Sequence, residues 1–176
     1  MNNWNRIWKP IVVLSVICVV VTAALAATNE VTAPIIEAAR IEAENAARLQ
    51  VLPEADDFTE VPGIAVDGVS AVYEANNGAG YVFTTSARGY GGEVVVMVGI
   101  NADGAIEALT VTSHGESPGI GTNVVDSAEY LGQYVGLPAQ QLTLGVDIDA
   151  HTGATVSSTA VIDAVNAAIE AYNQSP

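Results

Sequence analysis

A short segment near the end of the chain concentrates side chains that could bind or carry a phosphate group. Residues 149–158 read DAHTGATVSS and place the hydroxyls of Thr152, Thr155, Ser157 and Ser158 just before a stretch with helical apolar periodicity. The free N–H groups and the positive dipole at a helix N-terminus favour phosphate, and a neighbouring hydroxyl can bond to it or be esterified by it. An ordinary Ser/Thr helix cap is the alternative interpretation. The residues alone leave both open.

Two other loops combine residues that could take part in chemistry. Residues 113–122 read SHGESPGIGT, in which His114 and Glu116 could form an acid–base or metal-binding pair, or could make ordinary loop hydrogen bonds. Residues 89–92 read GYGG, and their glycines could let the backbone approach a flat ligand or simply form a turn. The residues of these loops favour the structural interpretation in each case.

Composition excludes several classes of protein. The chain has 176 residues and a net charge of −15, with 20 acidic and five basic side chains. A nucleic acid partner is excluded, because a phosphate backbone needs clustered Lys and Arg. The single cysteine, Cys18, excludes an internal disulfide or a thiolate metal cluster, and two histidines are too few for a histidine-rich metal site, so we expect no metal site.

The N-terminal part of the chain has the pattern of a membrane span. Residues 10–29 carry no charge and are rich in Val, Ile, Leu and Ala, and as a helix they would reach about 30 Å, the thickness of the hydrocarbon layer. Trp4 and Trp8 come just before this stretch, as do Arg6 and Lys9. The positive-inside rule therefore predicts a single-pass protein with a cytoplasmic N-terminus and its acidic bulk on the other side of the membrane.

Two other interpretations of this segment remain. Ala24-Leu25-Ala26 resembles the small-residue site of a cleaved signal peptide, and Cys18 could belong to a lipoprotein. A retained anchor is favoured because the apolar stretch is longer than the apolar region of a usual signal peptide, about 7–15 residues, and because Cys18 lies in the middle of the stretch behind Ile17. The stretch contains no acidic residue, so ion conduction is not expected from this chain.

The rest of the sequence predicts the helices and strands that position these candidate residues. Residues 32–52 predict a helix with Pro34 in its first turn, which could continue the membrane helix as a stalk, and residues 53–63 predict an acidic connector. Turn signals at 76–78 and 101–104 separate predicted antiparallel strands, and two further helices are expected. We expect strands at 69–74, 80–85, 93–100, 106–113 and 142–146, and helices at 126–134 and 157–173. The segregated pattern predicts an α+β fold.

The order of these motifs resembles the FMN-binding domain of the RnfG subunits of Rnf complexes, which the related NqrC subunits of sodium-pumping NADH:quinone oxidoreductases share. The resemblance runs through GYGG, the NADG turn, SHGESPGIGT and DAHTGATVSS, and it extends to the N-terminal stretches NEVTAPII and VLPEAD. It implies an α+β FMN-binding domain, with an antiparallel sheet and flanking helices, behind one transmembrane helix. The implied divisions are an anchor at 1–29, a stalk and connector at 30–62 and the domain at 63–176.

The resemblance also implies a covalent cofactor. In that family the last residue of a D-x-x-(S/T)-G-A-(T/S) motif carries FMN through a phosphoester, which a flavin transferase forms from FAD with magnesium. Here that residue is Thr155, and the rest of the motif is Asp149, Thr152, Gly153 and Ala154. The family's HxExPGxG loop, expected near the flavin ring, corresponds to His114, Glu116, Pro118, Gly119 and Gly121. Ser157 and Ser158 are further candidate contacts of the cofactor.

Two positions depart from the family pattern, and the resemblance also implies a function and partners for this chain. Thr152 stands where Ser is usual, and His151 where an apolar residue is common. The resemblance implies an electron-transfer subunit of a ferredoxin:NAD⁺ oxidoreductase that translocates Na⁺ or H⁺, without catalysis by this chain alone. Its partners would be polytopic subunits, iron–sulfur and flavin subunits, the flavin transferase and the lipid bilayer. The alternatives are an anchored extracytoplasmic flavin reductase and a non-redox binding domain.

Overall fold

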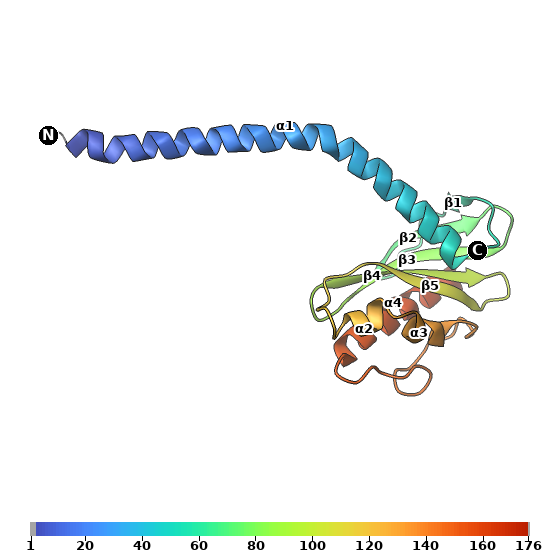
Figure 1. Ribbon diagram of the computed structural model, residues 1–176. Coiled ribbons are helices and arrows are strands. Elements are labelled where there is room, and N and C mark those ends of the chain that lie inside the picture. The colour runs from blue at the N-terminus through green and yellow to red at the C-terminus, as the bar shows by residue number, and fades with distance from the viewer. Residues whose placement is uncertain (1–2, 176) are drawn as a thin grey trace. The chain divides into compact units, whose positions relative to one another are not determined.

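A computed structural model describes residues 3–175 of the chain, with side chains from Trp8 onward. The chain divides into two compact units, one ending at Ala43 and one beginning at Glu44. Helix α1 (Asn3–Val51) contributes to both units (Figure 1). The side chains of Trp4 and Arg6, which the sequence places before the membrane span, lie outside the part of the chain whose side chains are described.

The first unit is a long apolar helix. Within the described residues, α1 is the one helix long and apolar enough to cross a membrane, and the side chains of its apolar window are exposed. The hydroxyls of Thr28 and Thr32 donate to the carbonyls of Ala24 and Thr28, which satisfies them inside the helix. The predicted helix at 32–52 is part of α1 and continues the apolar helix, but the expected first-turn position of Pro34 is wrong, because Pro34 lies inside α1. A proline inside a helix removes one backbone hydrogen bond, and the helix persists on either side of it.

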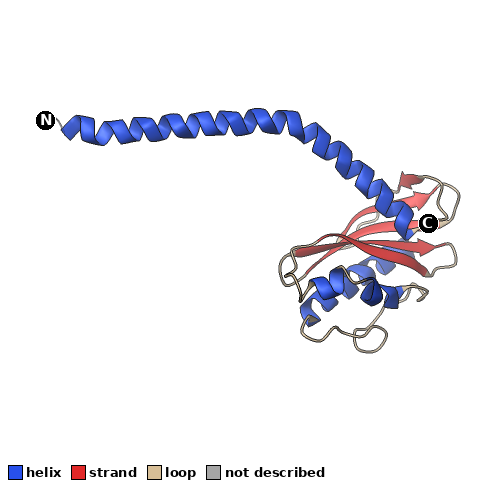
Figure 2. Ribbon diagram, in the orientation of Figure 1, coloured by secondary structure: helices blue, strands red, loops and turns tan. Residues whose placement is uncertain are grey.

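The second unit is an α+β domain, as expected. Its sheet is a five-stranded antiparallel meander in the order β1-β2-β3-β4-β5 (Figure 2). The strands are β1 (Phe58–Glu60), β2 (Val69–Ala75), β3 (Gly80–Arg88), β4 (Glu93–Asn101) and β5 (Ile106–Ser113). Both predicted turns are confirmed. At 76–78, the Gly78 N–H donates to the Ala75 carbonyl. At 101–104, Asn101 accepts hydrogen bonds from the N–H groups of Asp103 and Ala105, and Gly104 adopts a φ of +77°.

Each face of the sheet is covered by a different helix. Val94, Val96 and Val98 of β4 join the core that packs against α4 (Thr155–Gln174), together with Phe83 and Val165. Met97, on the alternate face, packs in a second, smaller core with Val51 and Leu52 at the end of α1. The central strands are therefore buried on both faces, which explains why β4 is almost continuously apolar.

The last turns of α1 dock closely on the sheet. Arg48 is almost buried, and its guanidinium carbon lies 3.8 Å from the centre of the Tyr73 ring, a cation–π contact. Gly99 of β4 faces the end of the helix so closely that a Cβ there would lie 2.1 Å from the carbonyl oxygen of Val51. Only glycine allows the backbone of the strand and of the helix to approach in this way.

Three expectations about the smaller elements need correction. The strand predicted at 142–146 is absent: the backbone of Leu142 bonds to the side chain of Asn166, and the residues after it form a local turn with one isolated bridge. The predicted helix 126–134 is α3 (Ala128–Leu131) followed by a 3₁₀ turn, because Ser127 caps it. The connector at 53–63 contains strand β1. Helix α2 (Thr122–Val125) was not predicted.

Candidate functional site

The N-terminus of α4 has no side-chain cap. Its N-cap residue is Ala154, and the first helical hydrogen bond is donated by Ser158 to the Ala154 carbonyl. The N–H groups of Thr155, Val156 and Ser157 therefore lack partners within the helix, as in the first turn of any helix. The interpretation of this segment as an ordinary Ser/Thr cap is therefore wrong. An uncapped N-terminus of a 20-residue helix is a suitable place for a phosphate group.

The hydroxyls around this N-terminus divide into two kinds. Those of Ser157 and Ser158 are buried and engaged: Ser157 donates to Glu116, and Ser158 accepts from the N–H of His151. Thr155 and Thr152 are exposed, and in the described part of the chain no hydrogen bond engages the Thr155 hydroxyl. Thr155 is therefore the hydroxyl of this segment that lies both at the helix N-terminus and open to a reagent.

The loop that leads into α4 is held from three sides, which explains its local shape. The Asp149 N–H donates to Gln133, the His151 N–H donates to Ser158, and Asn166 holds Leu142 upstream. Gly153 adopts a φ of +87°, a left-handed conformation that favours glycine, and its neighbour Ala154 is buried. The Asp149 side chain is exposed. Gln133 and Asn166 are polar residues of the site that sequence patterns did not indicate.

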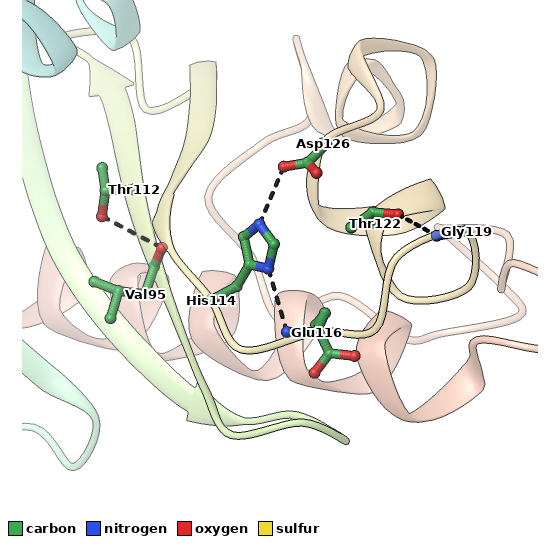
Figure 3. Close-up of polar contacts among 7 residues, drawn as sticks. All are labelled: Val95, Thr112, His114, Glu116, Gly119, Thr122 and Asp126. Carbon is green, nitrogen blue, oxygen red and sulfur yellow. Dashed lines mark hydrogen bonds and ion pairs between the residues drawn. The ribbon is translucent and has the colours of Figure 1, made fainter.

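His114 organises the second candidate loop rather than standing free in it. Its Nδ1 accepts a hydrogen bond of 3.2 Å from the N–H of Glu116, and its Nε2 lies 3.2 Å from Oδ1 of Asp126 (Figure 3). In the same loop the Gly119 N–H donates to the hydroxyl of Thr122. Both ring nitrogens of His114 are therefore engaged, one within the loop and one at the end of the following helical turn, which supports the structural interpretation of this residue.

The carboxylate of Glu116 is buried and well supplied with donors. The residue is 6% exposed. Ser157 donates to Oε2 at 2.5 Å, and the Gly91 N–H donates to Oε1 at 3.1 Å. Burial acts to raise the pKa of Glu116, but the hydrogen bonds from Ser157 and the backbone of Gly91 and Tyr90, with the charge of His114, outweigh it and lower the pKa. Both carboxylate oxygens are engaged by donors, an arrangement unlike that of a metal ligand.

The stability of the protein should therefore depend on the ionisation of Glu116. Because its native pKa lies below the ordinary value of 4.5, its contribution is fully present above that pH and is lost as the pH falls through the native pKa. We expect Glu116→Gln to lower the free energy of unfolding by about 1.5–3 kcal/mol at pH 7, the range for hydrogen bonds to charged groups, and by less near pH 3.

This expectation is checked by urea unfolding of the detergent-solubilised chain between pH 3 and 7. Glu93→Gln is the matched control, because Glu93 is an exposed glutamate on β4. A difference between wild type and Glu116→Gln that stays constant across this pH range would contradict the assignment.

The GYGG segment forms a turn between β3 and β4, as its structural interpretation predicts. Gly89 donates to the carbonyl of Gly92 at 2.7 Å. A Cβ on Gly89 would lie 2.2 Å from Oε1 of Glu116, and a Cβ on Gly91 would lie 1.9 Å from the carbonyl oxygen of Gly115. These glycines therefore allow the turn to contact the 113–122 loop.

The structure thus joins the three segments that the sequence singled out. The β3–β4 turn, the 113–122 loop and the first turn of α4 meet at the Glu116 carboxylate. Pro118 and Gly119 are exposed, while Gly121 is buried beside Glu116. Each segment also presents an exposed apolar side chain, namely Tyr90, Ile120 and Val156. Across the described residues, no group of three or more His, Cys, Asp or Glu side chains could hold a metal ion.

Two family models identify the N-terminal apolar helix and an FMN-binding domain in this chain. Residues 89–170 match the family model of the FMN-binding domain, and residues 1–51 match that of the RnfG N-terminal region.

Known proteins resemble the chain over nearly its whole length. The G subunit of the Na⁺-translocating ferredoxin:NAD⁺ oxidoreductase complex of Acetobacterium woodii is 35% identical, over 97% of this chain and 93% of that protein. The G subunit of the ion-translocating oxidoreductase complex of Methanosarcina acetivorans is 34% identical, over 97% and 96%. The crystal structure of Shewanella oneidensis NqrC is similar over 72% of each chain, with 20% identity and a TM-score of 0.49. The chain belongs to the RnfG family, the G subunits of ion-translocating oxidoreductase complexes, as the motifs indicated.

Proposed function

We propose that this chain is the electron-transfer subunit of RnfG type in an Rnf ferredoxin:NAD⁺ oxidoreductase that translocates Na⁺ or H⁺, and that it carries FMN covalently on Thr155. The names of its relatives and the match to the FMN-binding domain support the electron-transfer role. The observation that carries the attachment is the position of Thr155, an exposed hydroxyl at the first residue of an uncapped helix. The free N–H groups there would stabilise the phosphate of the phosphoester.

Attachment is a phosphoryl transfer between Thr155 and FAD. The Thr155 oxygen attacks the FMN phosphorus, the P–O bond between the two phosphates of FAD breaks, AMP leaves, and the hydroxyl proton is released. A flavin transferase with magnesium would catalyse this step and recognise Asp149, Thr152, Gly153 and Ala154. No residue of this chain has to act as a base, since the carboxylate bonded to the first turn, Glu116, is already engaged with Ser157.

Once attached, FMN supplies the electron chemistry, and the chain supplies position and electrostatics. The three segments that meet at Glu116 carry the exposed apolar side chains of Tyr90, Ile120 and Val156, which can contact a flat ring system. The covalent bond prevents loss of the cofactor outside the cytoplasm. Electron passage requires no proton transfer from His114, whose ring nitrogens are engaged in the loop.

The remaining subunits of the complex complete the proposed function. Polytopic subunits would conduct the ion, because the apolar stretch of α1 contains no acidic residue, and iron–sulfur and flavin subunits would exchange electrons with the bound FMN. The second unit and its stalk are strongly acidic: from Glu30 onward the chain has 20 carboxylates and three arginines. This charge favours partner surfaces that carry basic residues.

We also propose the division into an anchor at 1–29, a stalk and connector at 30–62 and the FMN-binding domain at 63–176, with the N-terminus cytoplasmic and the domain periplasmic or extracellular. The basic residues before the apolar stretch and the acidic residues after it support this orientation.

The orientation predicts which cysteines a membrane-impermeant maleimide reaches. In a Cys18→Ser background, we expect Asp103→Cys, in the exposed β4–β5 turn, to be labelled in right-side-out vesicles. Asn3→Cys should be labelled only after permeabilisation. The reverse pattern would exclude the proposed orientation.

Co-expression with a flavin transferase tests the attachment itself. The intact mass of the chain should increase by one FMN minus water only when the transferase is present, and peptide mapping should place the increase on residues 149–159. The same preparation should be yellow and should copurify with the other subunits when they are expressed. A colourless chain of unchanged mass would favour the non-redox binding domain, and FMN bound without copurifying subunits would favour the anchored flavin reductase.

A further inference from the structure

Glu116 connects more parts of the domain than any other buried polar side chain of the described chain. Its Oε2 accepts from Ser157 in the first turn of α4, 41 positions away in the sequence, and its Oε1 accepts from Gly91 in the β3–β4 turn. Its own N–H donates to His114, which in turn reaches Asp126 at the end of α2. Glu116 therefore joins three segments, and His114 extends this network to the end of α2.

Two glycines lie so close to this carboxylate that neither could carry a Cβ. A Cβ on Gly121 would lie 2.3 Å from Oε2 of Glu116 and 3.0 Å from Oγ of Ser157. A Cβ on Gly89 would lie 2.2 Å from Oε1. Glycines on both sides thus form a cradle around the carboxylate, which explains two glycines of motifs that are otherwise interpreted as ligand loops.

The chemistry of the cradle favours a carboxylate. The groups around it are donors: the Ser157 hydroxyl and the N–H groups of Gly91 and Tyr90. A carboxylate offers two acceptor oxygens, whereas an amide offers one and presents donors at its other atom. A glutamine at 116 would leave one acceptor oxygen for the backbone N–H groups, and its N–H₂ group would exchange the charge-assisted bond from Ser157 for a weaker neutral one.

The bond from Ser157 sets the position of Thr155. Ser157 is the third residue of α4, and Thr155 is the first. Residues of one helical turn move together, at about 100° and 1.5 Å per residue, so holding Ser157 fixes both the rotation and the height of Thr155. No side-chain cap restrains this turn, and the other hydrogen bond that holds it runs from the His151 N–H to the Ser158 hydroxyl.

We propose that Glu116 is the positioning residue of the flavin attachment site: through Ser157 it holds the first turn of α4 so that the Thr155 hydroxyl is presented to the incoming FMN phosphate. This inference rests on the proposed attachment at Thr155 and extends it to residues that never touch the phosphate. The carboxylate acts through the helix and is not a base in the transfer. A shift of about 1 Å in a reacting group can slow a reaction about a hundredfold, so the effect on the rate can be large.

The test compares transfer kinetics in single variants and in the pair. The detergent-solubilised chain made without transferase is incubated with the transferase, FAD and magnesium, and the increase in intact mass is followed over time. Glu116→Gln and Ser157→Ala should each lower kcat about tenfold while the KM for the chain changes less than about twofold, because the transferase motif is intact. The double variant should be no slower than the slower single variant, since both remove one interaction.

Two control variants and one measurement on the chain without FMN distinguish a loss of Thr155 positioning from a general loss of stability. Ser86 donates to Glu93 at 2.7 Å on the exposed surface of the same hairpin, so Ser86→Ala and Glu93→Gln remove a bond of the same chemistry and should leave kcat unchanged. In the chain without FMN, amide hydrogen exchange of Ser158, whose N–H makes the first hydrogen bond of α4, should accelerate in Glu116→Gln and Ser157→Ala but not in the controls. If circular dichroism shows that Glu116→Gln does not fold, Ser157→Ala carries the comparison.

The outcomes distinguish the two proposals. A wild-type kcat and unchanged exchange in folded Glu116→Gln or in Ser157→Ala would overturn the positioning role and leave the attachment at Thr155 intact. A wild-type chain that gains no FMN, or gains it elsewhere than Thr155, would overturn the proposed function.

Discussion

Replacing Thr155 with alanine is expected to abolish covalent attachment of FMN while leaving the fold intact. The side chain is exposed and makes no hydrogen bond with the described residues, so its removal costs little stability. The hydroxyl oxygen is the atom that forms the proposed phosphoester, so the loss of attachment should be complete rather than partial. Intact mass and in-gel flavin fluorescence of the chain co-expressed with the transferase measure this directly.

Two further variants sharpen this prediction. Thr155→Ser keeps the hydroxyl and should retain FMN, whereas Thr159→Ala should behave as wild type. Thr159 is the matched control because it is also exposed, lies one turn later on α4 and only donates to the backbone carbonyl of Thr155. Undiminished FMN on the Thr155→Ala chain would disprove the assignment of the attachment site.

The second large effect is expected at the junction between α1 and the sheet. Gly99→Ala would place a methyl group 2.1 Å from the carbonyl oxygen of Val51, where two backbone segments meet. Neither segment can yield easily, since Gly99 lies in β4, an interior strand paired with β3 and β5, and Val51 is fully buried in the smaller core. Overpacking of this kind typically costs about 1–3 kcal/mol.

The measurement is urea unfolding of the full chain in detergent, combined with limited proteolysis of the segment after α1. Gly99→Ala should lower the free energy of unfolding and increase cleavage near residues 52–57, because the end of the helix must move. Gly132→Ala is the control: Gly132 has a helical conformation and no atom within 4 Å of an added Cβ, so it should be neutral or slightly stabilising. Equal stability of the two variants would show that the approach of Val51 to β4 is not restrictive.

The elements predicted well are those whose signal is local. The β4–β5 turn forms because Asn101 bonds to the backbone two and four residues later, and Gly104 supplies the left-handed conformation. Helix α4 follows an apolar periodicity that one segment shows by itself. The apolar stretch of α1 is likewise a property of consecutive residues.

The elements predicted wrongly depend on partners that are distant in the sequence. Residues 142–146 have the composition of a strand, but the side chain of Asn166, 24 positions after Leu142, makes hydrogen bonds with both the N–H and the carbonyl of Leu142. Strand β1 has three residues in an acidic segment and exists because β2 pairs with it. Strand pairing requires a neighbour, and sequence patterns do not show which neighbour is available.

The amino-acid sequence alone predicted the apolar helix, the α+β class, the family and Thr155 as the candidate attachment residue. These features depend on motifs and periodicities, which neighbouring residues in the sequence form by themselves. Only the tertiary structure shows that Ala154 leaves the helix N-terminus uncapped, that Ser157 is engaged while the Thr155 hydroxyl is exposed, and that Glu116 joins three segments. The physical reason is that hydrogen bonding of a buried carboxylate is decided by groups that folding brings together from distant positions.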